Sequence, residues 1–287
     1  MGKILLGLLL ILLLTGCKHR PQMDDENSVY YWRTEWRLDS LESDFLSKYN
    51  INKVYCRYFD VVMDENNEPR PNATIVFTEA IPQGLELIPA VYITEDCMHQ
   101  PHEGMAERVV KRIVQMNETN DIFGVKEIQI DCDYTLRSRQ VYYDFLDQVR
   151  QEAARHQLRL STTIRLHQLS MDAPPVDYGV LMIYNTGDPQ KFMERNPILS
   201  LEDVQPYLHY IDDYPLPLAA AYPVYQWVRT IGGVHVIHEV DADEILQVKK
   251  AVETESDDLR HTILLYHLDS DNIKRYENKT FDAIYRH

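Results

Sequence analysis

The chain has 287 residues, a formal net charge of −16 and 45% hydrophobic residues. This length and composition suit a globular protein with one large domain or two small ones. The negative charge argues against a nucleic-acid partner, because phosphates require a basic surface; the acidity itself needs no explanation beyond solubility.

The first residues are typical of an export signal. Lys3 precedes an apolar run over residues 4–14, which is too short to span a bilayer comfortably. The run ends in Leu14-Thr15-Gly16-Cys17, which resembles the lipobox of bacterial lipoproteins. The resemblance implies removal of residues 1–16, a diacylglyceryl thioether on Cys17 and a cell-envelope location on a bacterial membrane. We expect the outer membrane, with the protein facing the periplasm or the exterior. An ordinary signal peptide with a chance cysteine is the alternative.

The mature chain then divides into a linker and one domain. Residues 17–28 are polar and aperiodic, which predicts a flexible lipidated tether, and residues 29–287 form the predicted domain. Three cysteines remain besides Cys17, and an odd number does not make a disulfide framework. Cys56 and Cys132 lie in apolar strand patterns, so we interpret them as small core residues.

Eight short runs predict buried parallel strands, because most of them are apolar and rich in β-branched or aromatic residues. They cover residues 29–33, 53–61, 85–93, 127–133, 159–166, 178–185, 216–222 and 262–268. Helical patterns occupy several intervals between them, at residues 40–49 with Asp39 as N-cap, 105–116, 138–156, 201–211, 242–252 and 272–285. This alternation predicts a (β/α)8 barrel of the TIM type.

Two intervals fit that barrel less well. Only residues 167–177 separate the fifth and sixth strands, which leaves little room for a full helix, and residues 224–240 could hold an extra hairpin. A doubly wound open sheet is the competing fold.

The fourth predicted strand carries the clearest chemical pattern. Its residues alternate, so that Ile128, Ile130 and Cys132 share one face while Gln129, Asp131 and Asp133 share the other. If the apolar face packs on helices, two carboxylates point into the barrel near its C-terminal end, where barrel enzymes have their active sites. Close carboxylates raise the pKa of the pair, which suits general acid catalysis. The alternatives are an edge strand with a solvated face, or Asp133 as a helix N-cap.

The fifth predicted strand supports this interpretation. Arg165 alternates with apolar residues and would point into the barrel beside the two aspartates. A buried arginine needs a carboxylate partner, so a purely structural ion pair is the alternative. His167, two residues further on, is a candidate proton carrier or merely a hydrogen-bonded loop residue.

The other strand ends are rich in aromatic and planar polar side chains, which suit a carbohydrate, because sugar faces stack on rings and hydroxyls bond to polar groups. Core packing is the alternative for each aromatic alone. The candidate substrate-binding residues are Trp32, Arg33, Arg57, Asp60, Arg165, His167, Tyr184, Asn185, Tyr222 and Tyr266.

We predict no cofactor and no metal. Cys97, His99 and His102 lie within six residues, but the paired spacings usual for zinc and a fourth ligand are missing. The sequence also has no phosphate-binding glycine loop, no Gly-x-Ser-x-Gly and no His-Glu-x-x-His.

Short motifs resemble those of a bacterial domain family of unknown function that is related to TIM-barrel glycoside hydrolases. They are Gln129-Ile130-Asp131-Cys132-Asp133 with the following Ser138 and Tyr142-Tyr143-Asp144-Phe145-Leu146, Tyr31-Trp32-Arg33 in the first strand, and Ser161-Thr162-Thr163 in the fifth. That family has no established reaction to carry over.

The fourth strand is also similar to the Asp-x-x-Asp-x-Asp-x-Glu motif of family 18 chitinases. If Asp131 and Asp133 match its last two aspartates, Thr135 stands where the family has its acid glutamate. A glycosidase would then need a second carboxylate from elsewhere, with candidates Asp60, Glu95, Asp188 and Asp269.

Three functional hypotheses follow. The first is a glycoside hydrolase-like envelope protein that acts on a polysaccharide or glycan through Asp131 and Asp133. The second is a glycan-binding or scaffold lipoprotein on a barrel that has lost catalysis. The third and weakest is a metal-dependent hydrolase that uses Cys97, His99 and His102.

Overall fold

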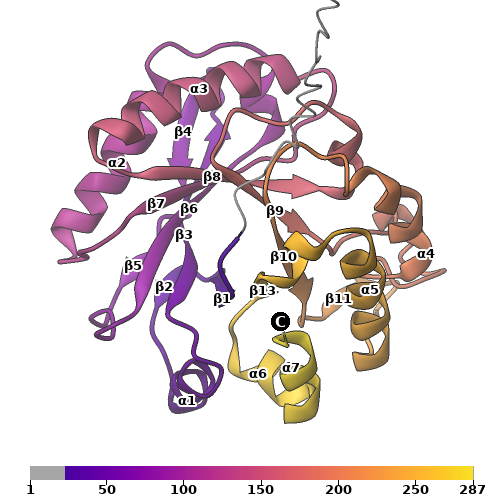
Figure 1. Cartoon of the computed structure of the whole chain (residues 1–287). Coiled ribbons are helices and arrows are strands. Elements are labelled where there is room, and N and C mark those ends of the chain that lie inside the picture. The colour runs from indigo at the N-terminus through magenta and orange to yellow at the C-terminus, as the bar shows by residue number, and fades with distance from the viewer. Residues whose placement is uncertain (1–22, 287) are drawn as a thin grey trace, which may run out of the picture.

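The computed structural model describes residues 23–286, which form a closed barrel of eight parallel strands (Figure 1). The barrel strands are β1 (Glu26–Tyr31), β3 (Lys53–Met63), β6 (Glu86–Ile93), β7 (Glu127–Asp131), β8 (Arg159–Arg165), β9 (Tyr178–Met182), β10 (Leu218–Pro223) and β13 (Thr262–Tyr266). Each predicted strand is present, with ends that differ by a few residues. The short, buried, β-branched runs therefore identified the sheet correctly.

The sheet closes because β1 pairs in parallel with both β13 and β3. The remaining strands follow in the order β13-β10-β9-β8-β7-β6-β3, so the ring has no open edge among these eight strands. Closure excludes the doubly wound open sheet. It also excludes an edge position for β7, which pairs with β6 and β8.

Helices cover the outside of the barrel (Figure 1). They are α1 (Ser40–Lys48), α2 (Met105–Thr119), α3 (Arg139–Arg155), α4 (Leu201–Val204), α5 (Ala242–Glu255), α6 (Ser270–Arg275) and α7 (Asn278–Ile284). Asp39 is the N-cap of α1, as predicted, and completes a capping box with Glu42. The interval between β8 and β9 holds only a 3-10 turn, Leu166–Ser170, in agreement with its expected shortness.

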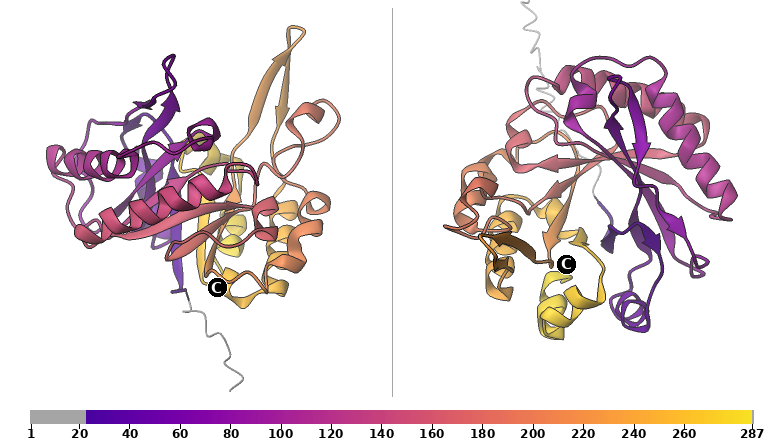
Figure 2. Two further views of the ribbon diagram at one scale, coloured as in Figure 1. Left: turned by 90° about the horizontal axis from the view of Figure 1, so that it is seen from above. Right: turned by 180° about the vertical axis from the view of Figure 1, so that it is seen from behind.

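In the part of the chain that the structure describes, five short strands lie outside the ring. The segment β4 (Pro69–Asn72) extends β3 as an antiparallel hairpin, and β2 (Glu35–Trp36) pairs with β5 (Val76–Phe77). The hairpin of β11 (Trp227–Ile231) and β12 (Val234–His238) fills the interval in which an extra hairpin was considered. It projects beyond the barrel at the same end as the β3–β4 hairpin (Figure 2, left). We call this end, where the barrel strands finish, the mouth, and the opposite end the floor.

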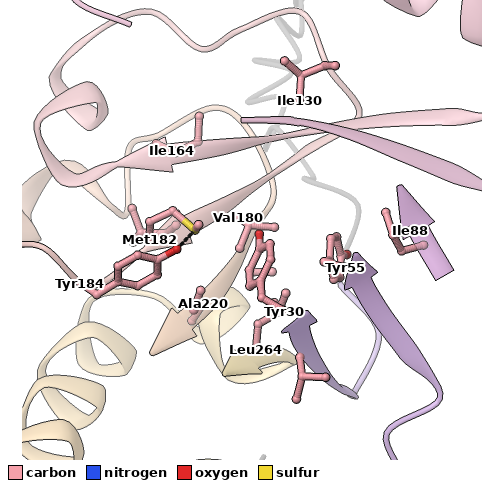
Figure 3. Packing of buried hydrophobic residues seen from close by; sticks show 14 of the residues in the cluster. Tyr30, Tyr55, Ile88, Ile130, Ile164, Val180, Met182, Tyr184, Ala220 and Leu264 are labelled. Atoms are coloured by element: carbon pink, nitrogen blue, oxygen red, sulfur yellow. Dashed lines mark hydrogen bonds between the residues drawn. The ribbon is translucent and has the colours of Figure 1, made fainter. Parts of the chain in front are cut away.

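The interior of the barrel is packed with side chains in layers, as this fold requires. Nearest the floor, the Glu127 carboxylate accepts hydrogen bonds from Ser161 (2.7 Å) and Tyr178 (2.5 Å). Above it, the Tyr30 hydroxyl donates to Gln129 Oε1 at 2.8 Å. Tyr30 and Tyr55 lie inside the ring in Figure 3, whereas Ile130 and Ile164 point to the other side of their strands. This is the inward–outward alternation predicted for the fourth strand.

The structure shortens the predicted tether. Residues 26–28 belong to β1, and Ser28 is buried, because the backbone of this segment pairs with β13 and β3. The polarity of these residues predicted a linker. A polar residue can nevertheless belong to the strand here, because the Glu26 carboxylate forms an ion pair with Lys53 at 2.6 Å. The signal peptide, Cys17 and the rest of the tether up to residue 22 lie outside the described residues. Within residues 23–286, no helix is both long and apolar enough to cross a membrane.

Candidate functional site

Asp131 points into the barrel at the last position of β7 and is 3% exposed. The Thr163 hydroxyl of the neighbouring strand β8 donates a hydrogen bond to its Oδ1 at 2.6 Å. The Arg165 guanidinium approaches the same oxygen, with Nη2 at 3.6 Å. The strand register thus brings an acid, a hydroxyl and a cation together inside the barrel.

Burial dominates the protonation of this carboxyl group. Desolvation raises the pKa of Asp131 to about 6; the Arg165 charge opposes this increase and the nearby Asp133 charge adds to it. A carboxyl group with this pKa keeps a proton in part of the molecules near neutral pH. This is the property that general acid catalysis needs.

Asp133 lies just beyond the strand, and its side chain is 47% exposed. Its Oδ1 accepts a short hydrogen bond from Arg165 Nε, so one guanidinium serves both aspartates. The N-cap of α3 is Ser138, which excludes the alternative that Asp133 caps this helix. Asp133 therefore forms the solvent-facing part of a charged group whose deeper part is Asp131.

A pocket of about 240 Å³ opens beside this group at the mouth. Four of the predicted residues besides Asp133 line it, namely Arg165, His167, Tyr184 and Asn185, together with Met182, Thr186 and Tyr207. The Arg165 guanidinium carbon lies 5.7 Å from the centre of the Tyr184 ring, so ring and cation form one wall. Burial lowers the pKa of His167, which favours its neutral form.

Aromatic rings occupy the adjoining part of the mouth. The Tyr266 ring centre lies 4.6 Å from that of Tyr184 and 5.8 Å from that of Trp32. The Arg57 guanidinium carbon is 5.7 Å from the Trp32 ring centre, and Arg57 Nε donates to Asp60 at 2.8 Å. Trp32, Arg57, Asp60 and Tyr266 therefore lie together, as their positions at strand ends predicted.

Two candidate residues lie elsewhere: Arg33, just beyond β1, turns toward helix α1, and Tyr222 on β10 turns toward helix α5. Arg33 Nη2 donates to Glu42 of helix α1 at 3.0 Å, and its guanidinium covers the Tyr31 ring. Tyr222 is fully buried, and the charge acting on its hydroxyl is that of Glu253 on helix α5. Both belong to the packing between sheet and helices rather than to the mouth.

Two tyrosines at the mouth were not predicted. Burial, followed by the charges of Asp133 and Asp131, raises the pKa of Tyr92 to about 12. Tyr92 is the register partner of Asp131 on the neighbouring strand, so both side chains point into the barrel. The alternation of Ala90 and Tyr92 in the third strand is the sequence pattern that could have predicted this. Tyr225 donates its hydroxyl to Asn185 Oδ1 at 2.5 Å. Tyr225 comes shortly after the end of β10, within residues 224–240, for which the sequence predicted no definite structure.

Thr135, which the fourth-strand resemblance would match to the acid glutamate of family 18 chitinases, is hydrogen-bonded to Glu95. Its hydroxyl donates to Glu95 Oε1 at 3.0 Å, and Glu95 Oε2 lies 2.7 Å from His99 Nε2. Partial burial alone would raise the pKa of Glu95, but hydrogen bonds from Ser138, His99 and Thr135 outweigh it and lower the pKa. Glu95 is therefore the hydrogen-bond acceptor that fixes the loop around Thr135. Its lowered pKa does not suit a proton donor.

The remaining cysteine and histidine candidates do not gather. Cys56, Cys97 and Cys132 are free and buried, as expected for Cys56 and Cys132. Within residues 23–286 no group of three potential metal ligands forms, so Cys97, His99 and His102 do not make the site that the third hypothesis requires.

Solved structures share this barrel. A chitinase from Bacteroides thetaiotaomicron superposes with a TM-score of 0.61 at 11% identity, over 91% of this chain and 95% of that one. A class V chitinase from Pseudomonas fluorescens gives 0.59 at 13% identity, over 91% and 98%. The spore cortex-lytic enzyme SleL of Bacillus megaterium gives 0.54 at 10%, over 86% and 71%. The chain has the fold of these glycoside hydrolase barrels.

Comparisons of sequence add nothing to this likeness, since no protein-family model and no curated protein matches the chain. At 10–13% identity the likeness shows the fold alone. Any role of the site must therefore be argued from its own geometry.

Proposed function

We propose that this protein is a lipid-anchored envelope protein of the glycoside hydrolase type, which acts on a glycan at the mouth of its barrel through Asp131 and Asp133. The observation that carries the proposal is the pairing of a buried carboxyl group of raised pKa with a second, solvent-facing carboxylate beside a pocket. The barrels of similar fold support a carbohydrate as the substrate class, because they include chitinases.

The two aspartates would have different tasks. Asp131 would supply the proton that the leaving oxygen needs when the glycosidic bond breaks. Water would then give its hydroxyl group to the sugar and its remaining proton back to Asp131. Asp133, which faces solvent, would lie beside the sugar ring and stabilise the positive charge that develops on it. Trp32, Tyr184 and Tyr266 would offer ring faces for stacking, and Arg57, Asp60, His167 and Asn185 would bond to hydroxyl groups.

The charges at the mouth favour a neutral glycan. Arg57 is paired with Asp60, and Arg165 is paired with Asp133. An anionic sugar would therefore have to compete with these carboxylates for both cations, and it would meet their repulsion. We expect neutral oligosaccharides to bind more tightly than polyuronates of the same length.

The experiment is a reducing-sugar assay on the purified protein with neutral polysaccharides, including chitin oligomers. We expect release by the wild type, a loss of at least 100-fold in Asp131→Asn and Asp133→Asn, and declining activity as the pH rises above about 6, where Asp131 loses its proton. Asp213→Asn, on the surface, is the matched control and should retain full activity. Full activity in both mouth variants would contradict the assignment.

Glycan binding without hydrolysis is the second candidate. Thr135 at the acid position and the lowered pKa of Glu95 favour it. Calorimetry with the same oligosaccharides separates the two: this candidate predicts binding that Trp32→Ala weakens, with no sugar released by the wild type.

A further inference from the structure

The chain enters the barrel at its floor and is held there by several bonds. The Glu26 amide donates to the His261 carbonyl at 2.8 Å, and the Thr262 hydroxyl donates to the Asp24 carbonyl at 2.9 Å. Lys53 Nζ lies 2.6 Å from Glu26. These partners stand at the beginnings of β13 and β3, so residues 24–26 are fixed to the end of the barrel opposite the mouth.

Little chain remains between this attachment and the proposed anchor. Six residue steps separate Cys17 from Met23, and even a fully extended chain of that length spans no more than about 22 Å. An acylated Cys17 would therefore keep the floor near the lipid surface. The mouth, with both projecting hairpins, lies at the far end (Figure 2, left).

The floor also carries an exposed aromatic side chain. Phe123 is 81% exposed and lies in the loop between α2 and β7. This loop is at the floor because β7 starts directly after it, and Lys126 lies 4.0 Å from Glu86, the first residue of β6. A large exposed apolar side chain in water is unfavourable, whereas a phenylalanine gains free energy on entering the boundary of a bilayer.

We propose that the floor of the barrel rests on the lipid surface, with Phe123 entering its interface, so that the mouth opens away from the membrane. This inference relies on the lipidation of Cys17 included in the proposed function. It also restricts the substrate: the site would take glycan chains that lie outside the anchoring membrane, and not the head groups of glycolipids within it.

The test compares two exposed apolar positions at opposite ends of the molecule. Phe123→Cys and Val234→Cys each receive a bimane label; Val234, 64% exposed at the tip of the β11–β12 hairpin, is the matched control. The three native thiols of the domain are buried and do not compete for the label in the folded protein. The mature lipidated protein, which begins at Cys17, is reconstituted into vesicles of phosphatidylethanolamine and phosphatidylglycerol with head-group nitroxide quenchers.

The proposal predicts at least threefold stronger quenching at position 123 than at position 234. Equal quenching at the two positions, stronger quenching at 234, or failure of the protein to remain with the vesicles would overturn it. Oligosaccharide binding by the same labelled proteins in detergent is measured separately. A lack of binding there would contradict the proposed function without changing the quenching result.

Discussion

Arg165 joins the two aspartates and is the residue on which the electrostatics of the site depend. Its Nε contacts Asp133, its Nη2 lies 3.6 Å from Asp131, and its guanidinium lies over Tyr184. Sequence alternation predicted that Arg165 points inward, but left open whether it serves only as a structural partner. The structure shows that one cation holds both carboxylates, so removing it would leave a buried charge without compensation.

Arg165→Gln should therefore destabilise the protein by about 3–5 kcal/mol at pH 7, as expected when one partner of a buried pair is removed. The loss should become smaller as the pH falls to 5, because Asp131 then takes up a proton. Urea unfolding at both pH values measures this. Arg150→Gln removes the exposed partner of Asp147 and is the control, with an expected loss of 1 kcal/mol or less. Equal losses in the two variants would contradict the account.

Asp131 makes stability depend on pH in the direction opposite to that of a salt-bridged surface aspartate. Its pKa rises from 3.8 to about 6 on folding, so the folded state binds the proton more tightly than the unfolded chain. This group therefore lowers the free energy of unfolding as the pH rises from about 4 to about 6, by roughly 3 kcal/mol in all.

Asp131→Asn should abolish this contribution. The stability of the variant relative to the wild type should increase by roughly 3 kcal/mol between pH 4 and pH 7, measured by urea unfolding. Asp213→Asn should show no such change, because Asp213 is exposed. A difference between Asp131→Asn and the wild type that is independent of pH would show that the native carboxyl group has an ordinary pKa.

Helix α1 is stabilised both by its local N-cap and by contacts with the rest of the barrel. The Asp39 carboxylate accepts a hydrogen bond from the Glu42 amide at 2.8 Å, and the Glu42 carboxylate accepts one from the Asp39 amide at 3.0 Å. The same Glu42 pairs with Arg33, so the cap links the helix to the end of the first strand. A helix of nine residues needs such support, because short helices are marginal alone.

Asp39→Ala should lower the free energy of unfolding by about 1 kcal/mol or more, since it removes the N-cap bond and also the hydrogen bond that Ser270 donates to Asp39. Thermal unfolding followed by circular dichroism measures the change. Ser47→Ala, at an exposed position in the same helix, should be neutral or slightly stabilising, because alanine is the better helix former. A loss for Asp39→Ala no larger than that for Ser47→Ala would show that the cap contributes nothing.

Strands were easier to predict than the segments between them. The eight barrel strands are buried on both faces, so most of them appear as short apolar runs that can be recognised without reference to the other strands. The pair β2–β5 consists of two residues in each strand, and it joins segments about 40 residues apart. No local pattern marks such a pair, because it depends on where the completed barrel places the two loops.

The candidate site, like the fold, could be predicted in its strands but not in its loops. Period-two alternation predicted that Asp131 and Arg165 point inward, and closure of the barrel brings Trp32, Arg57 and Tyr266 to the same end. Arg33 and Tyr222 were misplaced, because aromatic and charged residues at strand ends do not reveal by type which face they occupy. The hydrogen bond from Thr135 to Glu95 joins two connecting segments of the barrel, and no local sequence pattern in either segment predicts it.

Glycan binding at the mouth of the barrel is tested most directly by a crystal structure of the protein with a neutral oligosaccharide bound. We expect sugar in the pocket at the mouth, with a hydroxyl or glycosidic oxygen within 3.2 Å of Asp133 and a ring face on Tyr184, Tyr266 or Trp32. A sugar bound elsewhere on the surface, with the Asp133–Arg165 pair untouched and the pocket empty, would contradict it.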